Sequence, residues 1–225
     1  MCTPLLSTAF HRLRSRSRAL LCGAVALASA CSDTATAPAD PSATAADHAV
    51  AAGQSAASPA TAVLDFSLAQ PNASGFAGTA EMPGAAALLA ESFPITKTIT
   101  CPAGGTAATT GTLSGTMPAR GSFTLAVSMA TTLTNCGVPS GGKTLLLSTT
   151  TPLAVTGSYA VTDRTPASQQ TLRVQGTATL KISGSSAPAV PCPIDLTVTM
   201  ASGTRTASVS GSFCGSTVTN QVSLR

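Results

Sequence analysis

The chain has 225 residues, of which only 9% are charged and 3% aromatic, whereas 44% are hydrophobic. This balance is too apolar for a charge-driven disordered chain and too poor in Leu, Glu and Lys for a helical bundle. The formal net charge of +4 comes from arginines before residue 19. The later bases and acids balance and are scattered singly, which excludes a nucleic-acid-binding surface.

The N-terminal segment has the pattern of an export signal. Arginines between residues 12 and 18 precede an uncharged run over residues 19–30, and Cys31 follows directly. A basic start, a short apolar run and small residues at its end predict a secretory signal peptide over residues 1–30. The apolar run is too short to cross the hydrocarbon core of a bilayer as a permanent helix.

The end of this run, Leu27-Ala28-Ser29-Ala30-Cys31, resembles the lipobox of bacterial lipoproteins. The resemblance implies cleavage before Cys31, acylation of that cysteine and stable anchoring by its acyl chains. In lipoproteins of two-membrane bacteria, an aspartate directly after the cysteine favours retention in the inner membrane. Ser32 holds that position here, so the resemblance implies a lipid-anchored envelope protein in the outer membrane. Plain secretion is the alternative, because Ala28 and Ala30 also suit ordinary signal peptidase.

Residues 31–62 are a low-complexity segment of Ala, Ser, Thr and Pro, with no large apolar residue beyond Val50. Such a segment buries too little apolar surface to offset the entropy of ordering. The sequence therefore predicts a lipid-anchored flexible tether over residues 31–62 that holds the following domain away from the membrane.

Residues 63–93 form a lead-in to the folded domain. Leu64, Phe66 and Leu68 alternate with polar residues, which favours a short strand. Residues 83–91, which read PGAAALLAE, predict one short helix.

Residues 94–225 predict an all-β domain. Apolar and polar residues alternate with a period of two in runs near residues 123–130, 153–161, 171–182, 194–200, 207–213 and 218–224. Turn residues separate the runs, which predicts an antiparallel meander with one buried face.

Glycines recur on the apolar face of these runs, which suggests bends or close backbone approach. We therefore expect a strongly curved sheet or small barrel, with a β-sandwich as the alternative. Matching the apolar faces predicts Gly157 beside Gly176 and Ile194 opposite Gly211.

Four cysteines remain after the signal peptide and Cys31 are set aside, an even number that indicates disulfides in an exported chain. Meander geometry favours the sequential pairs Cys101–Cys136 and Cys192–Cys214. The predicted register sets Cys192 opposite Phe213, so the second pair would need a bulge or a strand end.

Residues 137–144 read GVPSGGKT and match the phosphate-loop pattern G-x-x-x-x-G-K-[ST]. A phosphate loop needs a helix after it, whereas strand-forming residues and a proline follow here, so we interpret the segment as a Gly-rich turn. His48 falls in the predicted tether, which leaves a Ser-His-Asp arrangement in the domain without its base. Asp195 alternates outward and is expected to be solvated.

Thr-x-Thr pairs recur along the strands. They could form a flat face that binds ice or a polymer, but threonine more often covers the solvated face of a sheet.

The sequence predicts a non-enzymatic envelope lipoprotein with a structural or protein-interaction β-domain. The alternative is a barrel carrier of a lipid or small apolar ligand. Expected partners are the membrane, through the lipid anchor, and an envelope protein or apolar ligand. No cofactor, metal, nucleotide or nucleic acid is expected.

Overall fold

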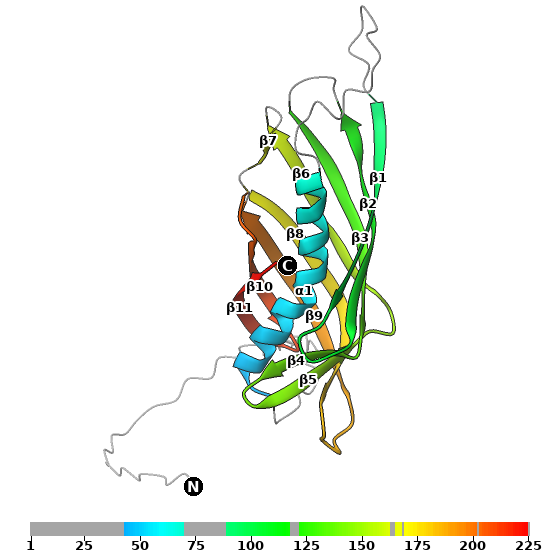
Figure 1. The fold of residues 1–225 in the computed structure, drawn as a ribbon. Helices are drawn as coiled ribbons and strands as arrows, with labels where there is room; N and C mark the ends of the chain where they lie inside the picture. The colour runs from blue at the N-terminus through cyan, green and yellow to red at the C-terminus, as the bar shows by residue number, and fades with distance from the viewer. Residues whose placement is uncertain are drawn as a thin grey trace, which may run out of the picture. The chain divides into compact units, whose positions relative to one another are not determined.

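A computed structural model describes residues 43–69, 89–117, 122–162, 165–167, 169–201 and 203–224. One helix, α1 (Ala45–Ala69), comes first and strands follow it (Figure 1). The strands are β1 (Leu89–Thr100), β2 (Thr106–Met117), β3 (Phe123–Thr134), β4 (Cys136–Ser140), β5 (Lys143–Ser148), β6 (Leu153–Thr162), β7 (Thr165–Pro166), β8 (Gln169–Ile182), β9 (Val190–Ala201), β10 (Thr206–Phe213) and β11 (Ser216–Ser223).

The strands form one antiparallel sheet in the order β1-β2-β3-β6-β8-β9-β10-β11. The β4–β5 hairpin is inserted between β3 and β6, and β5 pairs with β8 beyond the end of β6. The sheet curls strongly but does not close in the described residues, because β1 and β11, the two ends of this strand order, do not pair with each other. The predicted antiparallel meander and strongly curved sheet are confirmed, whereas the strands that the structure describes form neither a closed barrel nor a two-sheet sandwich.

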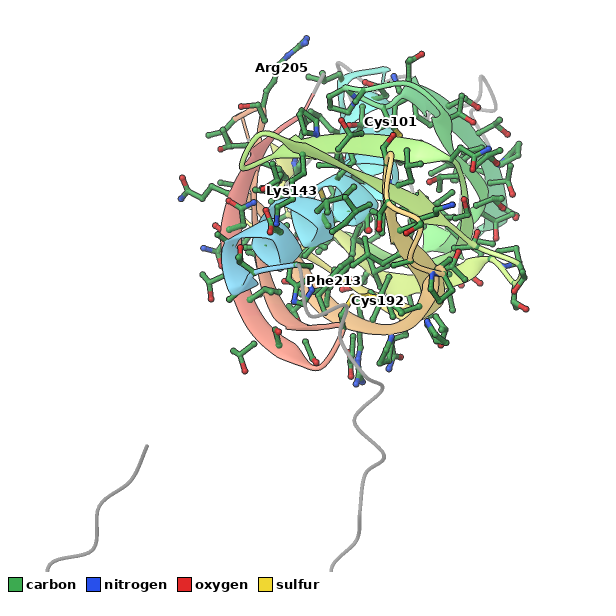
Figure 2. The ribbon with its side chains drawn as sticks, turned by 90° about the horizontal axis from the view of Figure 1, so that it is seen from below. Cys101, Lys143, Cys192, Arg205 and Phe213 are labelled. Atoms are coloured by element: carbon green, nitrogen blue, oxygen red, sulfur yellow. A yellow bond between two sulfur atoms is a disulfide. The ribbon has the colours of Figure 1, made fainter. Side chains whose placement is uncertain are left out.

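Helix α1 lies against the concave face of this sheet, and Figure 2 shows it enclosed by the strands. Nearly every residue from 51 to 63 is buried, whichever side of the helix it occupies. The helix also joins the two sheet edges. Asn220 of β11 donates a hydrogen bond through Nδ2 to the Ala49 carbonyl (3.0 Å), and Lys97 of β1 pairs with Asp65 (2.6 Å).

Residues 45–62 are therefore helical, and their assignment to a flexible tether is wrong. Alanine, the strongest helix former, is the commonest residue here. Thr44 and Asp47 form a capping box in which the Thr44 N–H donates to Asp47 Oδ2 (2.8 Å) and the Asp47 N–H to Thr44 Oγ1 (3.2 Å). The sheet supplies the apolar surroundings that the segment alone lacks.

The strand predicted at residues 64–68 is also wrong, because these residues form the last turns of α1. Phe66 packs against Phe93 of β1 (ring centroids 5.5 Å apart) and edge-on against Tyr159 of β6 (5.4 Å). Of the short helix predicted at 83–91, residues 83–88 lie outside the described residues, and residues 89–91 belong to β1.

The predicted pairing of glycines is wrong. Gly157 pairs with Leu172 and Gly176 with Ile194, while Gly211 pairs with Leu196. The interpretation of these glycines as points of close approach is confirmed. A Cβ at Gly157 or Gly211 would collide with a backbone carbonyl oxygen of the neighbouring strand.

Candidate functional site

The predicted lipidation site Cys31 and the following Ser32 lie outside the described residues, so the anchor stays a prediction. Within the part of the chain that the structure describes, no helix is both long and apolar enough to cross a membrane.

The structure contains both predicted disulfides, Cys101–Cys136 and Cys192–Cys214, with Cα–Cα distances of 5.3 and 4.2 Å. All four cysteines are buried. Their sequence separations of 35 and 22 residues correspond to about 3–4 kcal/mol of stabilisation each in the chain-entropy model. Two buried disulfides indicate an exported, non-cytoplasmic protein.

The observed register explains how the second disulfide forms without a bulge. Phe213 pairs with Ile194, two positions away from its predicted partner Cys192. Cys214 therefore lies in the turn after β10, where its N–H donates to the Pro193 carbonyl (2.9 Å) beside Cys192.

The phosphate-loop-like segment is the β4–β5 hairpin, as the interpretation of a Gly-rich turn requires. Gly141 and Gly142 form its two-residue tip with φ values of 56° and 77°, the left-handed conformation that such hairpin turns need. Lys143 points toward the start of α1 (Figure 2), and its Nζ lies 3.5 Å from Asp47 Oδ2. The lysine of the motif thus joins the hairpin to the helix cap.

Asp47 is the most strongly perturbed carboxyl group in the described residues. A hydrogen bond from the Ser140 side chain, then bonds from Thr44, and finally the charge of Lys143 hold the pKa of the Asp47 carboxyl far below its usual range. Burial acts in the opposite direction but is outweighed. The contacts of this carboxylate are those of a helix cap docked on a hairpin.

His48 is buried in the domain, which corrects its placement in a flexible tether. Its Nδ1 lies 2.9 Å from Ser216 Oγ of β11, and its ring centroid lies 6.1 Å from that of Phe213. Asp47 precedes it in the chain, but the Asp47 carboxylate faces Thr44, Ser140 and Lys143. Within the described residues, no group of three His, Cys, Asp or Glu side chains could hold a metal ion.

A small polar network lies between α1 and the sheet. Ser58 donates to the Ala107 carbonyl (3.1 Å), Thr109 donates to Ser58 Oγ (2.9 Å), and Thr109 and Thr131 are 2.8 Å apart. All three hydroxyl-bearing side chains are fully buried. Their mutual hydrogen bonds satisfy them within the fold, so the network fixes where the helix sits.

The convex face of the sheet carries hydroxyl side chains in rows that cross the strands. One row runs through Ser92, Ser114, Ala126, Ser158, Thr171, Thr199, Ser208 and Gln221. These side chains are exposed or half-buried, which agrees with a solvated face. Because the sheet curls, this face is convex, which does not suit the flat lattice of ice.

Asp195 lies on this convex face, as predicted. Arg173 donates to it through Nε (2.9 Å) and Nη2 (2.8 Å), and this pairing lowers the pKa of the Asp195 carboxyl. Both side chains are about half exposed, so the pair contributes little to stability.

A pocket opens at the other end of the domain, where α1 ends. It lies between the last turns of the helix, β7, the start of β8 and the β9–β10 turn, and its volume is about 180 Å³. We call it the helix-end pocket; its main lining residues are Val63, Leu64, Leu68, Pro166, Met200 and Arg205.

The sequence did not predict this pocket. Leu64 and Leu68 are one helical turn apart and lie on the same side of α1, but with Phe66 between them they also fit a strand alternation. The i, i+4 spacing of the two leucines was the signal available.

No family model, curated protein or solved structure matches this chain.

Proposed function

We propose that the protein is a non-enzymatic, lipid-anchored envelope protein whose β-domain is a structural or protein-interaction module. The observation that carries this proposal is the position of α1. A carrier of a lipid would need its concave interior for cargo, but here the helix occupies that space, with Ala51, Ala52, Ala56 and Ala60 fully buried. The protein's own chain takes the place that a lipid would fill.

The polar groups next to α1 support the same conclusion. The Asp47 carboxylate serves the helix cap and the β4–β5 hairpin, and Ser58 and Thr109 are bonded to one another. His48 binds Ser216 and packs near Phe213. Although His48 and Ser216 form a base–hydroxyl pair, the neighbouring Asp47 carboxylate, which a catalytic triad would need behind the histidine, instead faces Ser140, Thr44 and Lys143.

At 1.5 Å per residue, the 25 residues of α1 span about 37 Å. The β4–β5 hairpin, which contacts the start of the helix, and the helix-end pocket therefore lie at opposite ends of the domain.

Detergent-phase partitioning tests the anchor. We expect the wild-type protein in the detergent phase and Cys31→Ala in the aqueous phase or retained as an uncleaved precursor. Cys22→Ala, within the same apolar run, is the matched control and should partition like the wild type. Wild-type protein in the aqueous phase would refute the anchor. If the wild type partitions into detergent, sucrose-gradient separation of the two membranes tests the outer-membrane location.

Native mass spectrometry of the purified protein tests the choice between module and carrier. We expect the mass of the processed chain with its anchor and two disulfides. A stoichiometric co-purifying lipid would contradict the module and support the carrier.

A further inference from the structure

We propose that the helix-end pocket binds a small amphiphilic carboxylate, with the apolar part in the pocket and the carboxylate at Arg205. This inference goes beyond the proposed function and does not depend on the anchor. The occupant is limited by size: a cavity of about 150 Å³ holds benzene, whereas drug-sized ligands need about 300 Å³ or more. At about 180 Å³, the helix-end pocket fits one ring or a short alkyl chain.

The walls of the pocket are apolar because its polar lining groups are already engaged. The Gln170 side-chain amide accepts a hydrogen bond from the Ala160 N–H through Oε1 (3.0 Å) and donates one to the Ala160 carbonyl through Nε2 (2.9 Å). Ser67 donates to the Val63 carbonyl (2.9 Å), and Thr204 donates to the Ala201 carbonyl (3.0 Å). An occupant therefore meets mainly the side chains of Leu64, Leu68 and Met200.

Leu68 marks the mouth of the pocket. Its side chain is 52% exposed and it is one of two exposed large hydrophobic residues in the described chain. Covering it with an apolar group removes this surface from water, which favours binding.

Arg205 gives the pocket its charge preference. Among the described residues that line the pocket, Arg205 alone is charged. It belongs to none of the three ion pairs found in the described chain, and its side chain projects away from the domain into solvent (Figure 2). An anionic head group at the mouth of the pocket attracts this long side chain, which is free to turn toward it, and a carboxylate matches the paired donors of the guanidinium.

Methionine methyl resonances test the proposal in the purified exported protein. Met200 lines the pocket, whereas Met129 is buried in β3, outside the pocket lining. We expect hexanoate to shift the Met200 methyl signal saturably, with a dissociation constant on the order of 1 mM, and to leave the Met129 signal in place. Hexylammonium, of matched chain length and opposite charge, should bind more weakly.

Three variants separate the apolar and charged parts of the site. Leu64→Trp enlarges a half-buried side chain that lines the pocket, so it should abolish the effect of hexanoate on the Met200 signal. An unchanged Met129 signal reports that the variant is folded. Leu68→Ser, at an exposed position, should weaken hexanoate binding without a folding defect. Arg205→Gln should weaken it about threefold to fivefold, as expected for a solvent-exposed ion pair, while Lys181→Gln on the convex face should leave it unchanged.

Two results would overturn the proposal. One is a Met200 signal that does not move with hexanoate, or that moves equally with hexylammonium. The other is hexanoate binding to folded Leu64→Trp with wild-type affinity.

Discussion

Gly53 tests whether α1 sits against the edge strand β11 as described. A Cβ at this position would lie 2.5 Å from Val222 Cγ1 and 3.0 Å from Asn220 Nδ2. At an open helical site, Gly→Ala raises stability by about 1 kcal/mol. Here the added methyl group must displace a valine side chain, and such overpacking costs about 1–3 kcal/mol. We therefore expect Gly53→Ala to lower the free energy of unfolding by about 1 kcal/mol, reversing the usual sign.

Urea unfolding followed by circular dichroism measures this effect. Val222→Ala removes Cγ1, the nearer of the two atoms that the new methyl group would meet, so in that background Gly53→Ala should become neutral or stabilising. The double-mutant cycle should give a coupling energy of about 1–3 kcal/mol between the two positions. Gln54→Ala is the matched control, because it changes the next helical residue without adding volume toward β11.

If Gly53→Ala alone stabilises the protein by about 1 kcal/mol, the helix does not approach Val222 closely. A coupling energy near zero would have the same meaning. Either result would refute the seating of α1 between the edge strands.

Two further predictions concern the interior and the helix cap. Thr109→Val should lower the free energy of unfolding by about 1–3 kcal/mol, because Thr131 and Ser58 lose a buried partner. The control Thr110→Val, at an outward-pointing position of the same strand, should change this free energy by less than about 0.5 kcal/mol. Equal effects of the two variants in urea unfolding would contradict the buried network. Because the pKa of Asp47 is lowered in the folded state, its contribution is fully present above the unfolded-state pKa near 3.9 and is lost as pH falls below that value. The melting temperature of the wild type should therefore fall more steeply between pH 4 and 2 than that of Asp47→Asn. Parallel plots of melting temperature against pH for the two proteins would contradict the cap. Lys143→Met should retain most of the acid sensitivity, because the hydrogen bonds from Ser140 and Thr44 lower the pKa of Asp47 more than the charge of Lys143 does.

The sequence predicted those parts of the fold in which one face of a strand is buried and the other is exposed to solvent. Strands β3, β8 and β9 alternate between the filled interior and solvent, so residues such as Leu125 and Thr124 show the expected period of two. The cysteine pairs follow from the same meander. Register was harder: moving β10 by two residues against β9 keeps every side chain on its correct face, so face matching could not distinguish Phe213 opposite Cys192 from Phe213 opposite Ile194.

Helix α1 could not be recognised by the same method. Amphipathic periodicity requires a polar face, but residues 51–63 are buried on every side of the helix apart from the half-buried Gln54. Small side chains such as those of Ala52 and Ser55 then give no contrast between faces. A composition rich in Ala, Ser and Thr is typical of an unstructured linker, but in this chain it belongs to a helix that is buried on nearly every side. The helix-end pocket was missed for the same reason, because it depends on where α1 ends.

The small side chains of α1 are compatible with the strong curvature of the sheet. A helix of alanine, serine and glycine has a small radius, so an open sheet can wrap around it and bring both edge strands within reach. Unpaired edges invite association with other chains, and α1 contacts both of them, through Asn220 on β11 and Lys97 on β1. A bulkier helix would separate these edges and expose them. Helix α1 therefore bridges both edges of a sheet that stays open, and its small side chains leave room for this arrangement.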